Sequence, residues 1–342
     1  MTELRCPRCG SVYPPPARFC IRDGFPLVGP GAPPPRESPA LHRTGEHHPP
    51  SIGRPEPASA LTGRIIDGRY AIERKVGEGG MAYVYRAVDR ETNQPVALKV
   101  LMSKLASDAE SVARLEREAD LAMKLKHPNC CGLLAQGEAN GLPYLVMPFL
   151  AGETLASREN RVGPMPVAQA VPILIQLCHG LQHAHDQGVL HRDLKPENVM
   201  LVPEPDRERA VVMDFGLAKE WIAGGSELDK LTQTGIVLGT PEFMSPEQIR
   251  GKPVDQRSDI FALAVLAFEL LTAELPFEGK NAQETMLSHL TGKARRLRSV
   301  MASIPEALDE VIDRALSVDP AKRYPNMAEF ARALASASSR LQ

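Results

Sequence analysis

The sequence predicts an α+β protein in which a small β-rich lobe precedes a larger α-helical lobe. Short runs rich in β-branched and aromatic residues occupy positions 70–101, and helical periodicity dominates after Gly152. With 43% hydrophobic and 24% charged residues, the 342-residue chain can bury a sizeable core. Its formal net charge of −2 provides no overall field that would attract nucleic acid or an anionic membrane, so neither is expected as a partner.

Composition divides the chain into three parts. We expect residues 1–28 to form a small cysteine-bearing unit, 29–61 a flexible linker, and 62–338 the main body, with its two lobes at about 62–150 and 151–338. Residues 29–60 contain nine prolines and almost no large apolar side chains, so burial cannot offset the entropy of ordering them. The same composition also fits a proline motif that binds a partner domain.

The first part has the spacing C-x2-C-x10-C-x2-D, formed by Cys6, Cys9, Cys20 and Asp23. Two thiolates separated by two residues can face one metal, and a tetrahedral zinc site needs four ligands. The segment resembles a zinc-ribbon knuckle pair whose last ligand is aspartate, which implies bound Zn²⁺. A loose cysteine-bearing tail or a redox-sensitive thiol cluster is the alternative. We expect this unit to recruit a partner or to sense metal or redox state.

The location of the protein is inferred from what the sequence lacks. No apolar run follows a basic start, and the longest apolar segment, residues 260–268, is much shorter than the ~20 residues of a membrane span. The six cysteines do not form an extracellular disulfide pattern. We therefore expect a cytoplasmic protein without a membrane span, and a buried helix at 260–268.

Within the body, three short strands are predicted from YAIERKVGEGG, MAYVYRAVD and PVALKVL. A helix is expected at about 107–126, because Leu115, Ala119, Ala122 and Leu125 recur at helical spacing. Helical periodicity then predicts helices at 166–187, 257–273, 280–291, 305–316 and 327–338.

The first chemical signal is the glycine-rich stretch VGEGGMAYVY. Gly77, Gly79 and Gly80 lie between two predicted strands, so backbone N–H groups there can approach an anion without hindrance from a Cβ. Ala82 stands where a third glycine of G-x-G-x-x-G would be. The pattern is weak alone, because a tight glycine hairpin explains it equally well, and it is not a Walker loop.

Further charged residues follow on separate segments. Lys99 lies on the alternating strand VALKV, and Glu118 on the next predicted helix can reach it. The stretch HRDLKPEN contributes Asp193, Lys195 and Asn198, and Asp214 ends a predicted strand in VVMDFG. Phosphoryl transfer needs metal-binding oxygens, cations and a group that orients the attacking hydroxyl, and these residues supply all three.

The ordered set of glycine loop, Lys99, Glu118, HRDLKPEN, DFG and SPE is highly specific. Residues 70–337 resemble a protein kinase domain, and GEGGMAYVY and LTQTGIVLGTPEFMSPEQ resemble the bacterial serine/threonine kinases in particular. The resemblance implies the two-lobed protein kinase fold, ATP and Mg²⁺ (or Mn²⁺) as cofactors, and protein substrates. It implies transfer of the γ-phosphoryl group to serine or threonine hydroxyls in signal transduction.

The resemblance also implies roles for individual residues. Lys99 would hold the α- and β-phosphates while it pairs with Glu118. Asp193 would orient the substrate hydroxyl and accept its proton, Lys195 would neutralise the γ-phosphate, and Asn198 and Asp214 would hold Mg²⁺. Met147 occupies the gatekeeper position. The implied nucleotide-binding residues are Val76, Gly77, Glu78, Gly79, Gly80, Met81, Ala82, Tyr83, Val84, Ala97, Lys99, Met147, Pro148, Leu150 and Met200.

An activation segment is implied from Asp214 to Glu247. Thr232 and Thr234 are the expected phosphorylation sites, and Arg192 would bind the phosphothreonine; two threonines in an ordinary polar loop are the alternative. Thr240 would shape the substrate site. Glu247 and Arg323 would form a buried pair, and Asp259 would brace the catalytic loop. His191 is expected to be a packed structural residue, and the basic cluster at 295–298 a solvated surface or a docking patch.

Two other functions remain open. A pseudokinase scaffold would bind nucleotide or partners without transfer, but Lys99, Asp193, Asn198 and Asp214 are all present. A metal- or redox-sensing adaptor would use the N-terminal unit as its input. Similar kinases often pair through the small lobe, so the resemblance implies a homodimer as well.

Overall fold

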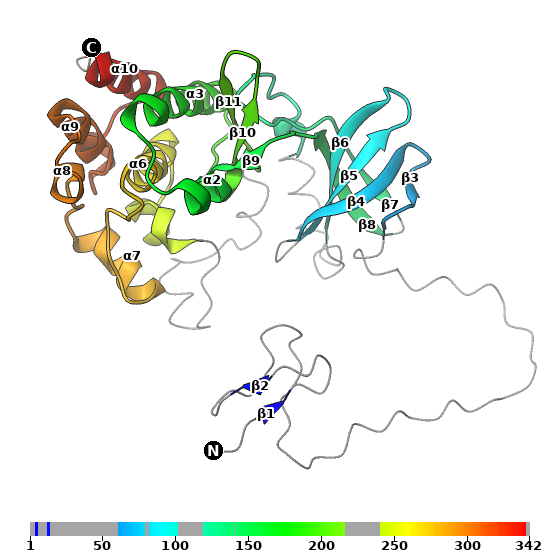
Figure 1. Cartoon of the computed structure of the whole chain (residues 1–342), viewed down its shortest axis with the longest axis horizontal. Helices are drawn as coiled ribbons and strands as arrows, with labels where there is room; N and C mark the ends of the chain where they lie inside the picture. The colour runs from blue at the N-terminus through cyan, green and yellow to red at the C-terminus, as the bar shows by residue number, and fades with distance from the viewer. Residues whose placement is uncertain are drawn as a thin grey trace, which may run out of the picture. The chain divides into compact units, whose positions relative to one another are not determined.

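A computed structural model describes residues 61–78, 82–101, 119–139, 141–215 and 240–339, together with the backbone of two short strands near the N-terminus. The chain divides into two compact units, Met1–Gly53 and Arg54–Gln342. In the first unit, β1 (Leu4–Arg5) pairs antiparallel with β2 (Val12–Tyr13), which places Leu4 opposite Tyr13. The second unit contains both predicted lobes (Figure 1).

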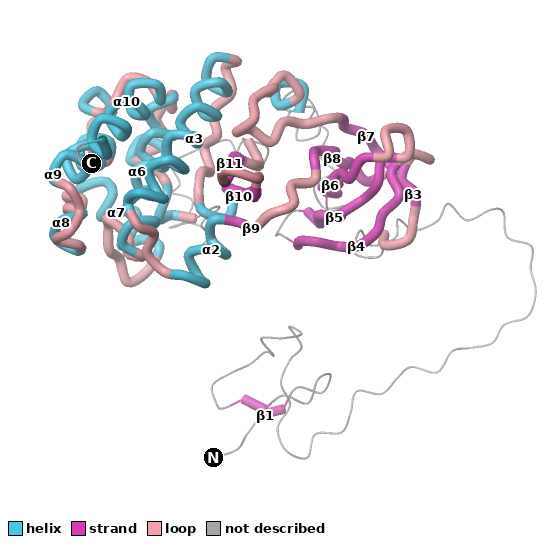
Figure 2. The backbone as a smooth tube through the Cα atoms, turned by 45° about the horizontal axis from the view of Figure 1, so that its top comes forward, coloured by secondary structure: helices cyan, strands magenta, loops and turns pink. Residues whose placement is uncertain are grey.

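The small lobe is a six-stranded antiparallel sheet in the order β3-β4-β5-β6-β8-β7 (Figure 2). The three strands predicted from sequence are confirmed. The members of the sheet are β3 (Ile65–Ile66), β4 (Tyr70–Glu78), β5 (Ala82–Asp89), β6 (Gln94–Leu101), β7 (Ala135–Ala139) and β8 (Leu142–Pro148).

Alternation along β6 gives this sheet two apolar faces. Val96, Leu98 and Val100 belong to one buried cluster, whereas Ala97 and Leu101 belong to another on the opposite face. The second cluster also contains residues that follow the small lobe in the chain, including Val211. Lys99 lies on the same face as Ala97, so its side chain projects toward the junction with the large lobe.

The large lobe is mainly helical, with a small sheet in the order β11-β10-β9 beside it (Figure 1). Its strands are β9 (Glu153–Thr154), β10 (Val199–Pro203) and β11 (Glu208–Val212). Its α-helices are α2 (Leu155–Val162), α3 (Val167–Asp186), α5 (Pro246–Ile249), α6 (Gln256–Thr272), α7 (Ala282–Thr291), α8 (Leu297–Val300), α9 (Glu306–Ala315) and α10 (Met327–Ser338). The short 3₁₀ helices among the described residues are η2 (Pro196–Asn198), η4 (Pro241–Phe243) and η5 (Pro320–Lys322).

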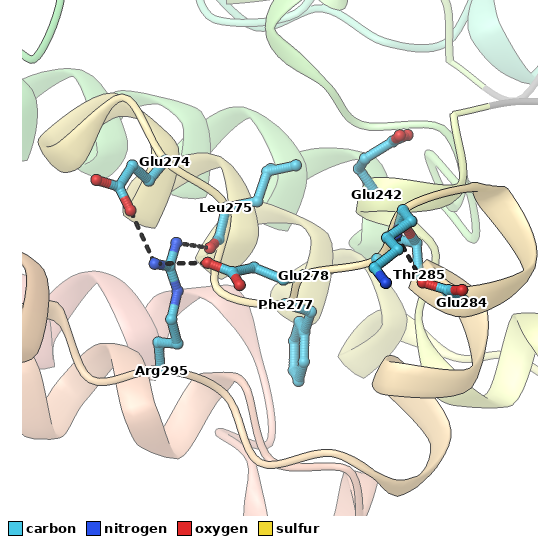
Figure 3. Close-up of a pocket in the computed structure, with 10 residues that line it drawn as sticks. Glu242, Glu274, Leu275, Phe277, Glu278, Glu284, Thr285 and Arg295 are labelled. Carbon is cyan, nitrogen blue, oxygen red and sulfur yellow. Dashed lines mark hydrogen bonds and ion pairs between the residues drawn. The ribbon is translucent and has the colours of Figure 1, made fainter.

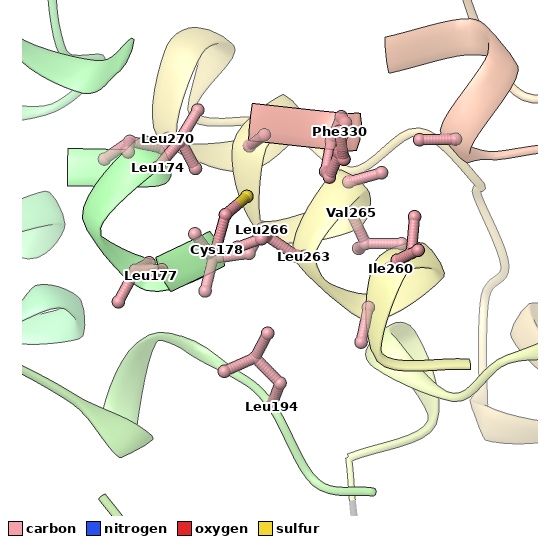
Figure 4. Close-up of a cluster of buried hydrophobic side chains, with 14 of the residues drawn as sticks. Leu174, Leu177, Cys178, Leu194, Ile260, Leu263, Val265, Leu266, Leu270 and Phe330 are labelled. Atoms are coloured by element: carbon pink, nitrogen blue, oxygen red, sulfur yellow. The ribbon is translucent and has the colours of Figure 1, made fainter. Parts of the chain in front are cut away.

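Helix α6 forms the centre of the large lobe. Asp255 caps its N-terminus by accepting a hydrogen bond from the Arg257 N–H. Every residue from 260 to 268 is buried, so the predicted buried helix is confirmed. Side chains of α3, α6 and α10 belong to one buried cluster here; Figure 4 draws Leu174 and Cys178 of α3, Leu266 of α6 and Phe330 of α10 among its members. In the described part of the chain, no helix combines the length and apolarity that crossing a bilayer requires.

The predicted helices of this lobe begin and end within two residues of the observed α3, α6, α7, α9 and α10. The helix expected at 107–126 is described only from residue 119, and it is helical as far as 122. The helix α2 and the strand β10 were not predicted. Strand β11 corresponds to the strand predicted in VVMDFG, but it ends at Val212 rather than at Asp214. The cysteines of the body, Cys130, Cys131 and Cys178, are buried and free.

Candidate active site

The segment 191–198 enters from α3 and leaves into β10, and α6 holds its backbone in place. The Asp259 carboxylate accepts hydrogen bonds from the backbone N–H groups of His191 and Arg192, both at 2.9 Å. It also lies 2.7 Å from His185 Nε2. Burial acts to raise the pKa of Asp259, but the hydrogen bond from His185 and the nearby histidines outweigh it, so the carboxylate stays ionised.

This anchoring stabilises an unusual backbone. Arg192 has φ of 62°, a left-handed conformation that is costly for a residue with a Cβ. Two N–H bonds to one buried carboxylate on a central helix offset that strain. Asp259 therefore positions the residues that follow Arg192 in the chain, beginning with Asp193.

The imidazole of His191, the first residue of this segment, is buried inside the protein. It is fully buried, its Nε2 lies 2.8 Å from the Met213 carbonyl, and its Nδ1 accepts from the Asp193 N–H at 3.3 Å. Because a carbonyl can only accept, Nε2 carries the proton of the neutral ring. Burial lowers the pKa of His191 against the opposing attraction of Asp259. The ring thus ties residue 193 to the strand that leads to Asp214.

Asp193, Lys195 and Asn198 lie together. Lys195 Nζ is 3.4 Å from Asp193 Oδ2 and donates to Thr240 Oγ1 at 3.2 Å. Asn198 Nδ2 donates to the Asp193 carbonyl at 2.8 Å, with Oδ2 of the same residue at 3.4 Å. The Asp193 carboxylate, which can accept a proton, therefore lies 3.4 Å from the Lys195 cation and 3.4 Å from the Asn198 amide nitrogen.

Lys99 reaches this group from the small lobe. Its Nζ donates to Asp214 Oδ1 at 2.7 Å, across 115 residues of sequence. Burial acts to raise the pKa of Asp214, but the charge of Lys99 and this hydrogen bond outweigh it, so the net shift is downward. Asp214 has φ of 56°, a second left-handed residue at this site. Glu118, the expected partner of Lys99, lies outside the described residues.

Asn198 and Asp214 are neighbours, because the Met213 N–H donates to the Asn198 carbonyl at 2.8 Å. The Asn198 amide donates through Nδ2, which leaves its Oδ1 as an acceptor. An amide oxygen and an ionised carboxylate are the hard donors that Mg²⁺ prefers, so the residues fit a magnesium ion that also binds phosphate oxygens and water.

Several residues that the resemblance places beside the nucleotide belong to one apolar cluster. Ala82, Ala97 and Met147 are buried in it, and Val84, Leu150 and Met200 pack against it. Met147 lies directly opposite Ala97 in the β6–β8 register, and Pro148 opposite Val96. Beside the glycine-rich stretch, Gly77 of β4 pairs with Val84 of β5, and Glu78 pairs with Tyr83; Val76 is exposed.

Some predicted residues lie outside the described part of the chain. They are the glycine-loop residues Gly79, Gly80 and Met81, the helix residue Glu118, the threonines Thr232 and Thr234, and the proposed zinc ligands Cys6, Cys9, Cys20 and Asp23.

The segment that begins at Thr240 is attached to the large lobe at several points. Gln248 Nε2 donates to the Arg192 carbonyl at 2.8 Å. Glu247 and Arg323 form a bidentate ion pair, with Nη1–Oε1 at 2.7 Å and Nη2–Oε2 at 2.9 Å. Both side chains are almost completely buried.

A hollow of about 300 Å³ adjoins the catalytic segment, and sequence reasoning missed its acidic lining. Glu159 of α2 and Glu269 of α6 face it together with Glu197 of η2. Burial first, and then the neighbouring carboxylates, raise the pKa of Glu159 to about 8 and that of Glu269 to about 7. Glu159 Oε1 and Glu269 Oε2 are buried without a hydrogen-bond partner among the described residues.

These shifted carboxyls predict a pH-dependent gain of stability on substitution. The folded pKa of Glu159 lies above its unfolded value, so the stability linked to its proton is lost as pH rises from about 4.5 through about 8. We expect Glu159→Gln to raise the free energy of unfolding at pH 8.5 by roughly 1–3 kcal/mol, after allowance for partial exposure, and to change it little at pH 5. Denaturant titration measures both. The exposed Glu310→Gln is the control; equal effects at both pH values would contradict the assignment.

A second hollow, of about 610 Å³, lies between the end of α6 and α7 (Figure 3). Arg295 bridges Glu274 at 2.8 Å and Glu278 at 2.9 Å on its wall. The other members of the basic cluster are paired too, Arg296 with Asp309 and Asp313, and Arg298 with Glu306. Their charges are thus locally neutralised, which favours the solvated-surface interpretation over an anion-docking patch.

Comparison with known proteins matches this geometry to one family. The protein kinase domain family matches residues 70–333. Serine/threonine-protein kinase pkn3 of Myxococcus xanthus is 42% identical over 274 residues, which is 78% of this chain and 50% of that protein. PrkC of Bacillus subtilis is 37% identical over 264 residues, or 77% of this chain and 40% of that protein. The chain therefore spans about half or less of the length of these relatives.

Solved structures give the same result. The kinase domain of Mycobacterium tuberculosis PknI aligns with a TM-score of 0.65 and 27% identity, covering 81% of this chain and 98% of that domain. Rad53 1–466 in complex with AMP-PNP aligns with a TM-score of 0.63 and 25% identity, covering 77% of this chain and 64% of that one.

Proposed function

Because this chain belongs to the protein kinase family, we propose that it transfers the γ-phosphoryl group of Mg-ATP to serine or threonine hydroxyls of protein substrates, in signalling. The observation that carries the proposal is the meeting of Lys99 with Asp214 and of Asp193 with Lys195 and Asn198. These five side chains come from three separate segments, at 99, 193–198 and 214, and each is of the type that phosphoryl transfer requires. The similarity to bacterial serine/threonine kinases such as pkn3 and PrkC supports the acceptor class.

The roles follow from the charges. Asp193 orients the acceptor hydroxyl and takes its proton as the new O–P bond forms and the bond from the γ-phosphorus to the bridging oxygen breaks. Lys195, beside both Asp193 and Thr240, neutralises charge on the transferred group. Lys99 binds the α- and β-phosphates. Mg²⁺, held by Asn198 and Asp214, would screen the phosphate charges.

The test of this function is direct. The purified chain, incubated with labelled ATP, Mg²⁺ and casein, should yield labelled phosphoserine or phosphothreonine. Nucleotide binding without any labelled product would favour the pseudokinase scaffold instead.

The proposal extends to control by autophosphorylation of Thr232 and Thr234. The support is their position in the polar stretch LTQTG between Asp214 and Thr240, together with Arg192 beside the catalytic aspartate. A guanidinium binds phosphate through charge-assisted bonds, so phosphorylation would order the segment. We expect the double substitution Thr232→Ala, Thr234→Ala to lower turnover at least about tenfold. Phosphatase-treated wild type that keeps full turnover would argue against this control.

We further propose that Cys6, Cys9, Cys20 and Asp23 bind Zn²⁺ and that the N-terminal unit receives the input signal. The support is their knuckle spacing alone. Metal analysis of the purified full chain decides it, since absence of zinc removes the proposal. We also propose a cytoplasmic location on the basis of the sequence composition, and cell fractionation tests it. We also propose a homodimer formed through the small lobe on the basis of the family resemblance, and analytical sedimentation tests it.

A further inference from the structure

His289 of α7 is a buried histidine that no catalytic role explains. It is 1% exposed, and its ring lies 4.4 Å from Phe277 and 5.5 Å from Phe261, measured between ring centroids. Phe277 is also part of the wall of the larger hollow in Figure 3. Burial lowers the pKa of His289 to about 4, so the ring is neutral at physiological pH.

The ring makes one specific hydrogen bond to another segment. Its Nδ1 lies 2.7 Å from the Met244 carbonyl, 45 residues earlier in the chain. A carbonyl oxygen can only accept, so Nδ1 must carry the proton. The aromatic neighbours fix the plane of the ring, and the N–H therefore has one direction in which to donate.

Met244 ends the loop that faces the catalytic segment. The loop is closed on itself by the Phe243 N–H donating to the Thr240 carbonyl and the Met244 N–H donating to the Pro241 carbonyl. Its first residue, Thr240, accepts the hydrogen bond from Lys195. Its last, Met244, is 2% exposed and packs with Ile249, Met286 and Leu290. Helix α7 thus contacts the loop at Met244, the end opposite to Thr240, which lies beside Lys195.

We propose that His289 is a positioning residue for the protein substrate: it holds the Met244 carbonyl and so sets the loop 240–244 against Asp193 and Lys195. This inference rests on the proposed function and adds which element aligns the acceptor protein. His289 touches neither nucleotide nor the reacting groups, so its loss should weaken use of the protein substrate and leave ATP binding intact.

The histidine can be replaced by two amides that separate donation from packing. The Asn side-chain nitrogen is as many bonds from the backbone as Nδ1, whereas the Gln nitrogen is one bond further, as Nε2 is. Asn at position 289 can therefore still reach the Met244 carbonyl, while Gln and Leu cannot reproduce that bond. If His289 only filled space, Gln at this position would not impair the protein more than Asn.

The experiment measures KM for casein and KM for ATP in the full chain bearing His289→Asn, His289→Gln or His289→Leu, with the exposed His179→Gln as control. We expect Gln and Leu to raise KM for casein at least about fivefold, as loss of one buried hydrogen bond implies, with KM for ATP within about twofold and Asn close to wild type. Amide hydrogen exchange across residues 240–249 should quicken in Gln and not in Asn.

An unchanged KM for casein in the Gln and Leu variants overturns the inference, and so does a parallel rise in KM for ATP. If the Leu variant does not fold, the Asn and Gln pair decides alone. Wild type that labels no casein would refute the proposed function. Hydrogen exchange needs no activity, so it still tests whether His289 holds the loop 240–244. Equal exchange rates in the Asn and Gln variants would refute that link.

Discussion

Asp193→Asn should lower kcat by about 10²–10⁴-fold while the affinity for Mg-ATP stays within about twofold. Asparagine has the same shape, so Asn198 can still donate to the residue 193 carbonyl, which belongs to the backbone. What disappears is the negative charge beside Lys195 and the ability to take the proton of the acceptor hydroxyl. The loss therefore falls on the chemical step.

Turnover of labelled ATP, together with calorimetric titration of nucleotide, separates these quantities. Asp206→Asn, on the exposed β10–β11 turn, is the matched control and should keep wild-type kcat. Asp193→Asn that retains more than about a tenth of wild-type kcat would assign the proton transfer to another group.

The strands of the small lobe could be predicted because their alternation reflects local burial. Val96, Leu98 and Val100 face one apolar cluster and Ala97 the other, as the pattern VALKV indicates. Helix α2 could not be predicted in the same way, because only Leu155 of its eight residues is buried and no apolar period appears. Its N-terminus is instead set by Thr154, whose side chain accepts from the Ser157 N–H.

The catalytic group was predicted as a set of motifs, and folding decides which members touch. Spacing cannot show that Lys99 contacts Asp214, because 115 residues separate them and the contact depends on how the lobes meet. The left-handed backbone of Arg192 and Asp214 likewise has no sequence signature, since neither is a glycine. The backbone at Arg192 is stabilised from outside its own segment, by Asp259.

The acidic hollow shows the limit of motif reasoning most clearly. Glu159 and Glu269 belong to different helices, and Glu159 looks like an ordinary surface acid in its own segment. Only the packing of α2 and α6 around η2 brings them together and raises their pKa values. A signal in the sequence was available only for Glu269, which interrupts the apolar run of α6.

Arg323→Met should destabilise the large lobe more than any other single substitution considered for it. The guanidinium donates to both Glu247 oxygens, to the Ser317 carbonyl at 2.7 Å and to the Arg257 carbonyl at 2.8 Å. Methionine fills similar volume but leaves a buried carboxylate without its cation. We expect the free energy of unfolding to fall by about 3–5 kcal/mol, a decrease in Tm on the order of 10 °C.

The pH dependence identifies the cause. Burial acts to raise the pKa of Glu247, and Arg323 at present outweighs it, so the net shift is downward. Wild type therefore gains stability from this carboxylate above its unfolded pKa and loses it as pH falls through the lower folded pKa. Without Arg323, burial is opposed only by the hydrogen bonds to Glu247, including the one from Ser258, so its pKa rises. The carboxyl can then protonate, and the penalty should be smaller at pH 5 than at pH 8.

Two comparisons make the result decisive. The exposed Arg332→Met, which breaks a surface pair with Glu329, should change the free energy of unfolding by less than about 0.5 kcal/mol. Adding Glu247→Gln to Arg323→Met should recover part of the loss, because the uncompensated charge is gone while Ser258 can still donate to the amide oxygen. A double variant as unstable as the sum of the two single variants would mean that packing around Arg323, including its 4.9 Å contact with the Phe261 ring, dominates over the ion pair.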